Sequence, residues 1–373
     1  MTNDVIEINR LTSVCSDCGN CLYYCPIYNA ELIEPDSPRG KINIIRSLMD
    51  GTLSDSPENM KFTERCLMCG SCEHNCSKGV EFVDLMIKFR NHISGGNKLS
   101  LSSKIKLNFV SSQNLKKLAG IFHLNPVKTK KKILLKKRTD NYEKNKKGKS
   151  LNFDILLFPG CYAEESRPEI TSGINFFFEK KGFSVVSPEK IKYCGSHFIE
   201  QGLGRKFNKI KKKNLKIFSK YKFRYIVVPS GREVHTLKKF YDIKDVEIFE
   251  LSEFLFLHLR DLKINTSFLE KNKKFTYHDP SYNINMLGIK EEPRYFLKKF
   301  GDQFVDERSW ICCGYSGITD KGMEDTLKEI TKKYKERLNE LGVDAVVTSS
   351  VECYQHLLTH FKKKIIFFTD IFE

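Results

Sequence analysis

Two cysteine-rich segments near the start of the chain have the ligand spacing of an iron–sulfur protein. Residues 15–26 contain the pattern C-x₂-C-x₂-C-x₃-C-P, and residues 66–76 repeat the cysteine spacing, with Ser77 in place of the proline. Thiolates are soft ligands that suit iron–sulfur clusters. Zinc sites favour two separated cysteine pairs over three consecutive steps of three residues. We therefore expect these segments to hold two [4Fe–4S] clusters.

The ligands of the two expected clusters are crossed between the segments. In two-cluster ferredoxins of this spacing, the fourth cysteine of each motif ligates the other cluster. The first cluster is predicted to take Cys15, Cys18, Cys21 and Cys76. The second cluster is predicted to take Cys66, Cys69, Cys72 and Cys25. Gly19 and Gly70 allow the backbone to pass close to each cluster, where a Cβ would crowd it.

Helices, and not a small sheet, are expected to position these cysteines. Between the motifs, Ser37-Pro-Arg-Gly-Lys41 precedes apolar residues at positions 42, 45, 48 and 49, a spacing that fits one helical face. Gly51 is placed to end this helix. Residues 84–89, after the second motif, have a similar pattern and are also expected to be helical. The pattern predicts a helical ferredoxin domain over residues 1–97.

A basic linker is predicted over residues 98–150. The chain has a net charge of +17, and residues 128–150 contain eleven Lys and Arg against two acids, with little apolar periodicity. A solvated domain boundary explains this composition, and a docking strip for an acidic partner or an anionic membrane face remains an alternative. No aromatic residues alternate with these lysines and no nucleic-acid-binding module is recognised, so nucleic acid is not expected as a partner.

The C-terminal half repeats itself at an offset of about 120 residues. Each copy starts with a short apolar strand and a turn, at residues 154–161 and 274–281, and continues with alternating helices and strands. This alternation predicts an α/β fold with mostly parallel sheets. We place the two copies at residues 151–262 and 263–373, which makes the whole chain an α+β multidomain protein.

Five loop positions of each copy are expected to converge, because ligand sites of parallel sheets lie at the strand ends. The second copy has Ser281, Cys312, Cys313, Ser350 and Cys353 there. The first copy has Cys161, Tyr193, Cys194, Ser230 and Glu233, and we expect it to be a vacant structural duplicate whose cysteines pack as small apolar side chains. Histidine and aspartate residues near these loops are expected to act as hydrogen-bonding groups at turns and strand ends, and not as ligands. They are His197, His235, His278 and Asp279.

The second copy keeps three thiolates. Three thiolates can hold a cube that has one open or oxygen-ligated iron, whereas a serine ligates iron only as an alkoxide, which is a poor ligand for a soft cluster. A third iron–sulfur cluster held by Cys312, Cys313 and Cys353 and a copy without a cluster are therefore both left open.

These motifs give the chain its resemblance to a known family. It resembles the iron–sulfur subunits that fuse a two-cubane helical ferredoxin to a pair of cysteine-cysteine-glycine (CCG) domains, such as those of heterodisulfide reductase, glycolate oxidase and anaerobic glycerol-3-phosphate dehydrogenase. The resemblance rests on the eight N-terminal cysteines, on Ser37–Gly40, on Tyr277–Pro280 and on Cys312–Gly314. In heterodisulfide reductases, a five-cysteine set holds a non-cubane cluster that acts on the disulfide. Ser281 and Ser350 depart from that set.

The resemblance implies an electron-transfer subunit that passes electrons between a flavoprotein partner, of the 2-hydroxy acid or glycerol-3-phosphate dehydrogenase type, and a quinone-linked or thiol acceptor. The alternative is a disulfide reductase subunit that is catalytic at Cys312, Cys313 and Cys353, and a third hypothesis is an assembly or anchoring subunit. Whether the chain itself turns over a substrate is left open. No dinucleotide-binding or P-loop motif is present in the sequence.

A cytoplasmic location is expected. Residues 1–10 contain Asp4 and Glu7 and lack the apolar segment of a signal peptide, and no apolar run approaches the ~20 residues of a membrane span. Peripheral attachment at the inner face of the membrane is an open alternative. Thirteen cysteines in a reducing compartment favour metal or redox chemistry over disulfides.

Overall fold

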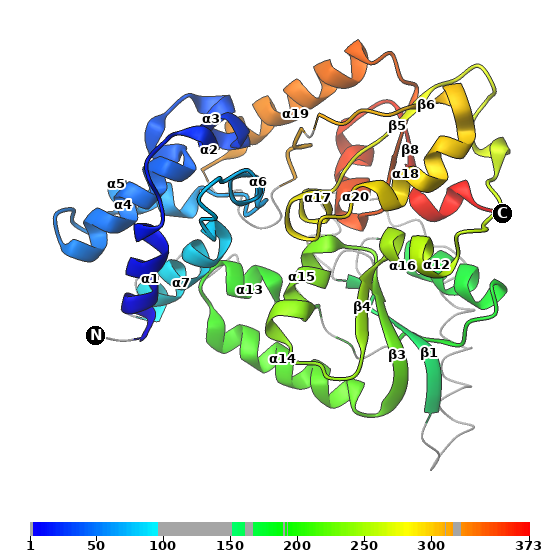
Figure 1. Ribbon diagram of the computed structural model, residues 1–373, viewed down its shortest axis with the longest axis horizontal. Helices are drawn as coiled ribbons and strands as arrows, with labels where there is room; N and C mark the ends of the chain where they lie inside the picture. Colours follow the sequence, from blue (N-terminus) through cyan, green and yellow to red (C-terminus); the bar gives the residue numbers. More distant parts are fainter. Residues whose placement is uncertain are drawn as a thin grey trace.

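The computed structural model describes residues 3–95, 151–160, 167–188, 191, 193–309, 311–315 and 322–373. A helical N-terminal region is followed by two α/β units that contain one sheet each (Figure 1). The expected α+β organisation is therefore confirmed. The predicted linker over residues 98–150 and the predicted site residue Cys161 lie outside the described residues.

The N-terminal region consists of short helices around the two cysteine motifs. They are α1 (Asn3–Ser13), α2 (Asn20–Tyr24), α3 (Pro26–Glu31), η1 (Glu34–Asp36), α4 (Pro38–Asp50), α5 (Pro57–Glu64), α6 (Ser71–His74) and α7 (Phe82–Gly95). Helix α4 is the helix predicted between the motifs. Ser37 caps it by accepting a hydrogen bond of 2.9 Å from the Gly40 backbone N–H, and Gly51 ends it with a left-handed φ of 83°.

The first α/β unit has a parallel sheet in the order β2-β1-β3-β4. Its elements are β1 (Leu151–Leu157), α12 (Pro168–Lys180), β2 (Val185–Val186), α13 (Ser196–Glu200), α14 (Gly204–Phe218), β3 (Tyr221–Val228), α15 (Gly231–Phe240), β4 (Glu247–Glu250) and α16 (Leu251–His258). Because consecutive strands are parallel, each must be joined to the next by a crossover, and helices supply the crossovers where the connection is described.

The second unit repeats this topology in the order β6-β5-β7-β8, again parallel. Its elements are η2 (Thr266–Phe268), β5 (Phe275–Tyr277), α17 (Ser281–Met286), α18 (Glu291–Leu297), η3 (Lys298–Gln303), β6 (Phe304–Val305), α19 (Glu324–Glu340), β7 (Ala345–Thr348), α20 (Val351–His360), β8 (Lys364–Phe367) and η4 (Phe368–Ile371). Corresponding strands occupy corresponding places in the two sheets, so the internal repeat read from the sequence is a repeat of structure.

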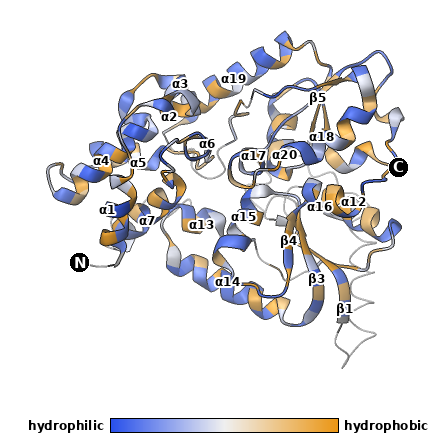
Figure 2. Cartoon of the chain, in the orientation of Figure 1, coloured by the Kyte–Doolittle hydropathy of each residue, from blue (hydrophilic) through white to orange (hydrophobic). Residues whose placement is uncertain are grey.

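Two large apolar cores join these parts. One core contains side chains of both α/β units, such as Phe178, Phe254 and Phe275, and Figure 2 shows apolar residues on α12 and α16, which contribute to it. The other core combines the N-terminal helices with the first unit, for example Phe89 with Phe198. Helix α19 of the second unit reaches α3 of the N-terminal region (Figure 1). The N-terminal region thus packs against both units.

None of the described helices is both long enough and apolar enough to cross a membrane.

Candidate iron–sulfur and metal centres

The structure gathers the eight N-terminal cysteines around two hollows. Cys25 lines a hollow of about 390 Å³ together with three cysteines of the second motif, Cys66, Cys69 and Cys72. Cys76 lines a hollow of about 450 Å³ together with three cysteines of the first motif, Cys15, Cys18 and Cys21. The fourth cysteine of each motif therefore faces the other motif. Cys72 and Pro38 line both hollows, so the hollows are neighbours.

Both cysteine loops have the same unusual backbone conformation. The residue before the second cysteine of each motif, Asp17 or Met68, has a positive φ of 56° or 55°. The glycine after that cysteine, Gly19 or Gly70, has a φ of 82° or 73° and starts a short helix. Left-handed conformations in close succession bend the chain sharply, and the bend turns the cysteines of each loop toward one hollow.

Burial disfavours the negatively charged thiolate form of these cysteines unless a nearby cation compensates the charge. Burial raises the pKa of Cys21 to about 11, and it raises the pKa values of Cys25, Cys69 and Cys72 as well. Iron ions would supply the missing positive charge. Backbone N–H groups also reach the sulfurs, since Met68 donates to Cys66 Sγ over 3.4 Å and Val80 to Cys76 Sγ over 3.5 Å. The donor set therefore fits sulfur-ligated clusters.

The start of helix α4 lies between the two hollows. Lys41 lines the hollow of Cys25, and Arg39 lines the hollow of Cys18. The Lys41 side chain is 2% exposed and donates to the Asp36 backbone carbonyl, and burial lowers its pKa. Gly40 has no room for a side chain, because a Cβ there would lie 2.0 Å from the Glu34 carbonyl oxygen. Through these contacts, the segment 37–41 helps to form the walls of both hollows.

Side chains from other elements hold the two loops in place. Arg46 of α4 donates to the Cys15 carbonyl over 2.8 Å and pairs with Asp17 over 2.8 Å. The second loop is held from the C-terminal half instead, by Asn285 of α17, which donates to the Cys69 carbonyl over 2.9 Å. The first loop is therefore held by a side chain of the N-terminal region, and the second loop by a side chain of the second α/β unit.

A group of three metal donors forms in the second α/β unit. One donor atom each from His278, Cys313 and Cys353 lies within 4.8 Å of the others, and all three residues are buried. His278 follows strand β5, and Cys353 lies in the first turn of α20, after strand β7. The donors therefore meet at the carboxyl ends of parallel strands. A hydrogen bond from Cys313 lowers the pKa of Cys353, and the nearby His278 lowers it further.

The remaining predicted residues of this unit have different surroundings. Cys312 packs near Cys25 and Cys69 of the N-terminal region, whereas Cys313 packs with Cys353. The Ser350 hydroxyl accepts from the Cys353 backbone N–H over 3.4 Å and donates to Glu352 over 2.7 Å. Ser281 is the first residue of α17. The sequence analysis gave His278 a hydrogen-bonding role at a strand end and no role as a ligand. In the structure its ring is one of three groups that could bind a metal ion.

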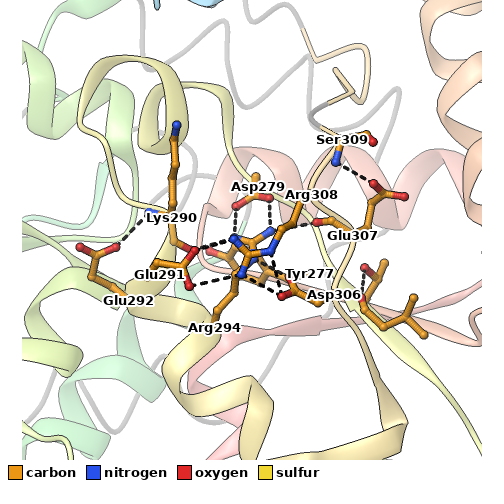
Figure 3. A network of polar contacts seen from close by, with 12 residues as sticks. Tyr277, Asp279, Lys290, Glu291, Glu292, Arg294, Asp306, Glu307, Arg308 and Ser309 are labelled. Carbon is orange, nitrogen blue, oxygen red and sulfur yellow. Dashed lines mark hydrogen bonds and ion pairs between the residues drawn. The ribbon is translucent and has the colours of Figure 1, made fainter.

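A charge network centred on the buried Arg294 fixes the strand end at Asp279 (Figure 3). Arg294 of α18 is 3% exposed and donates to both carboxylate oxygens of Asp279, over 2.9 and 2.7 Å. It also pairs with Asp306 over 2.7 Å and donates to the Glu307 carbonyl over 2.9 Å. Burial acts to lower the pKa of Arg294, but these charge-assisted bonds together outweigh it and raise the pKa. Asp279 thus acts as a structural hydrogen-bonding group, as the sequence suggested.

The first α/β unit places other side chains at the corresponding positions. Cys194 is buried, burial raises its pKa, and its sulfur accepts from the Ser196 backbone N–H over 3.4 Å. The Tyr193 ring lies 4.8 Å from His197, and the Ser230 hydroxyl donates to Glu352 of the other unit over 2.6 Å. Glu233 is buried. Within the ranges that the structure covers, these residues do not belong to a group of three metal donors.

Comparisons with known proteins agree with this architecture. The 4Fe-4S dicluster domain family matches residues 12–80, and the cysteine-rich domain family matches residues 155–232 and 275–358. An uncharacterized iron–sulfur protein of Methanocaldococcus jannaschii is 26% identical over 96% of this chain and 70% of its own length. The glycolate oxidase iron–sulfur subunit of Escherichia coli is 23% identical over 99% of this chain and 95% of its own length.

A third relative is a subunit of the dihydromethanophenazine:CoB–CoM heterodisulfide reductase of Methanosarcina mazei, which is 26% identical over 86% of this chain and 83% of its own length. The fold and these matches define the class: an iron–sulfur protein in which a 4Fe-4S dicluster domain precedes two cysteine-rich domains. Within this class, the chain is a homologue of glycolate oxidase iron–sulfur subunits and of this heterodisulfide reductase component, as the motifs predicted.

Proposed function

We propose that the chain is an electron-transfer subunit that holds two [4Fe–4S] clusters and passes electrons between a flavoprotein partner and a downstream acceptor. Its relatives are iron–sulfur subunits of oxidoreductase complexes. Cys15, Cys18, Cys21 and Cys76 would bind one cluster. Cys66, Cys69, Cys72 and Cys25 would bind the other cluster.

The observation that carries this proposal is the pair of neighbouring hollows, each lined by three cysteines of one motif and the fourth cysteine of the other. A bound [4Fe–4S] cluster takes up or releases one electron at a time, at a potential set by charge, hydrogen bonds and solvent exposure. Around the hollows the chain supplies the N–H groups of Met68 and Val80 and the buried ammonium of Lys41. Two adjacent centres can accept electrons singly from a two-electron donor.

The experiment is anaerobic reconstitution of the full chain, followed by iron and sulfide analysis and electron paramagnetic resonance of the reduced protein. We expect about eight irons and eight sulfides per chain in two clusters. The isolated chain should be reduced reversibly, yet it should not oxidise glycolate, lactate or glycerol 3-phosphate. A colourless protein with zinc on the eight N-terminal cysteines would refute the proposal.

The flavoprotein partner is proposed to be a dehydrogenase of the 2-hydroxy acid or glycerol-3-phosphate type, since one relative is named as a subunit of glycolate oxidase. The acceptor would be quinone-linked or a thiol carrier, and the complex would work in the cytoplasm or at the inner face of the membrane. Affinity purification of the tagged chain from its native cells, with flavin analysis of the eluate, tests this. Recovery of the chain without any flavoprotein would contradict it.

A second candidate function is disulfide reduction in the second α/β unit, at Cys312, Cys313 and Cys353. The observation in its favour is that the sulfurs of Cys313 and Cys353 lie within 4.8 Å of each other, and one relative belongs to a heterodisulfide reductase. Here a third iron–sulfur cluster would raise the iron content to about twelve per chain. Turnover of a disulfide with reduced viologen would favour this function, and its absence with two clusters intact would exclude it.

A further inference from the structure

We propose that the outer face of helix α14 attaches this subunit to an anionic membrane surface. Helix α14 contains seven Lys and Arg and no acidic residue. The longer segment 201–232 contains eleven Lys and Arg and again no Asp or Glu. The inference goes beyond electron transfer, because it concerns the surface that holds the subunit and not the clusters that the subunit contains.

Most of the cationic side chains of α14 are gathered on one side of the helix. A helix turns by about 100° per residue, so five of them fall within little more than a quarter of its circumference. The opposite side buries Phe207 and Phe218 in the core that joins the first unit to the N-terminal helices. The five are all exposed and are called the basic face: Arg205, Lys209, Lys212, Lys213 and Lys216.

The protein itself does not compensate the charge of the basic face. In the described part of the chain, no carboxylate forms an ion pair with these five side chains. Helix α19, which precedes β7 as α14 precedes β3, has five basic and five acidic residues. There Lys328 pairs with Asp325, and Lys332 pairs with Glu329. The predicted linker over residues 98–150 is itself basic and would be repelled by the basic face.

The basic face also works against the stability of its own helix. The N-terminus of a helix carries a partial positive charge, yet the first turn of α14 contains Arg205 and Lys206 and no acid. Like charges four residues apart, such as those of Lys212 and Lys216, repel each other. An anionic surface outside the chain would offset both effects.

The composition of the basic face fits lipid headgroups better than it fits a protein or a nucleic acid. The centres of stable protein interfaces are enriched in aromatic residues, Met and Arg and depleted in Lys. The basic face consists of four Lys and one Arg, and none of the exposed large apolar side chains of the described residues belongs to α14. Grooves that bind single-stranded nucleic acid combine positive charge with stacking aromatic residues, and both aromatic residues of α14 are buried.

The position of α14 suits contact with a flat surface. The helix has 15 residues and is therefore about 22 Å long, and Figure 1 shows it at the lower edge of the first unit. Exposed basic residues continue beyond its end, at Lys220, Lys222 and Arg224. Each basic residue near an anionic leaflet strengthens attachment by about fivefold. The whole row should therefore bind firmly but reversibly, with a strong dependence on salt.

Attachment through α14 would leave the first cysteine loop open to the solution. Helices α2 and α3, which follow this loop, lie at the upper edge of the molecule in Figure 1, away from α14. Cys18 of the loop is exposed. If the proposed electron-transfer function holds, a soluble flavoprotein could thus reach the first cluster while the subunit stays on the membrane.

The test is co-sedimentation of the full reconstituted chain with sucrose-loaded vesicles, either of equimolar phosphatidylcholine and phosphatidylglycerol or of phosphatidylcholine alone. We expect binding to the anionic vesicles only at ~0.1 M salt, and release at ~1 M salt, where the Debye length is about 3 Å. Combined replacement of Lys209, Lys212 and Lys216 by Glu should weaken binding at least tenfold. Replacement of the same three residues by Arg keeps the charge and should leave binding as in the wild type.

Two further triple variants have the same change of net charge and separate the basic face from the charge of the whole chain. Replacement of three exposed lysines of α19 by Glu should leave binding nearly unchanged; they are Lys328, Lys332 and Lys335. Replacement of three lysines of the predicted linker by Glu should have a smaller effect than the α14 variant; they are Lys130, Lys131 and Lys132. An iron content and a thermal unfolding midpoint equal to those of the wild type show that each variant is folded.

Other outcomes would overturn the inference. No binding to the anionic vesicles at ~0.1 M salt would refute it, and loss of a copurifying acidic protein from the α14 variant alone would then assign the basic face to a protein partner. Equal binding to neutral vesicles would show an apolar contact, and an equal loss of binding in all three Glu variants would show an unspecific effect of net charge. Iron content and reversible reduction are measured on the same samples, so failure here is distinguishable from failure of the proposed electron-transfer function.

Discussion

The side-chain amide of Asn285 donates a hydrogen bond of 2.9 Å to the backbone carbonyl of Cys69. The next residue, Met286, lies directly over Gly70, so that a Cβ on this glycine would be 2.3 Å from Met286 Sδ. Helix α17 of the second cysteine-rich domain therefore covers the second cysteine loop of the N-terminal region. The geometry of that loop depends on the C-terminal half of the chain.

Gly70→Ala is expected to lower cluster occupancy. The substitution combines the strain of a φ of 73° with overlap against the Met286 side chain. We expect at least about 2 kcal/mol of destabilisation and an iron content well below that of the wild type. Gly51→Ala is the matched control, because Gly51 has a φ of 83° and no atom within 4 Å of the added Cβ. It should cost only about 1 kcal/mol and keep its iron. Equal effects of the two variants would contradict the role of α17.

Cys25→Ser is expected to damage the cluster that the second motif holds, although Cys25 belongs to the first motif. The reason is that Cys25 lines the hollow of Cys66, Cys69 and Cys72. Electron paramagnetic resonance of the reduced protein should show one altered signal and one unchanged signal. Cys76→Ser should produce the reciprocal pattern. If Cys25→Ser instead altered the same signal as Cys15→Ser, the crossed assignment would be wrong.

Lys41→Met is expected to lower the midpoint potential of the cluster held by Cys25. A buried ammonium favours the extra electron of the reduced cluster, and Lys41 lines the same hollow as Cys25 and Cys66. At an effective dielectric constant of about 20, the loss corresponds to a shift on the order of 50–100 mV. Redox titration followed by electron paramagnetic resonance measures it. Lys61→Met, on the exposed face of α5, is the control and should leave both potentials nearly unchanged because solvent screens its charge. A potential that rises or stays constant in Lys41→Met would refute this effect.

The parts of the fold that follow local patterns could be predicted from the sequence. Gly51 ends helix α4 as expected, and the apolar runs around residues 226 and 346 form the parallel strands β3 and β7. Such features depend on residues that are close in sequence, so a periodic pattern and a turn residue are sufficient to predict them.

The group of three possible metal ligands in the second unit, His278, Cys313 and Cys353, could not be predicted in the same way. His278 approaches Cys353 only because β5 and β7 are neighbours in the sheet, and nothing near residue 278 records that pairing. The sequence analysis grouped Cys312 and Cys313 as ligands of one possible iron–sulfur cluster. Successive side chains of a chain outside helices tend to point to opposite sides, and these two pack in different clusters. The choice between them is a property of the tertiary structure.

Glu250 gives the fold a pH dependence whose sign can be worked out. This residue caps α16 and accepts from the Ser252 backbone N–H over 2.6 Å, and burial raises its pKa to about 7. In the unfolded chain its pKa is about 4.3. A raised pKa in the folded state means that its contribution to stability is fully present below about pH 4.3 and is lost as the pH rises to 7, by about 3 kcal/mol in total. His235 and His356 act in the opposite sense, because burial lowers the pKa of each to about 4.

Glu250→Gln isolates this contribution from that of the histidines. Glutamine keeps an oxygen that can accept from the Ser252 N–H but has no proton to lose, so the variant should lack the Glu250 dependence and keep that of His235 and His356. Relative to the wild type, its free energy of unfolding should increase by about 3 kcal/mol between pH 4.5 and pH 7. Anaerobic unfolding at a series of pH values measures this difference, and Glu247→Gln, at the exposed start of β4, serves as the control with little change. A difference between Glu250→Gln and wild type that does not vary with pH would show that Glu250 stays ionised in the folded protein, with its charge compensated by the hydrogen bonds of the α16 N-terminus.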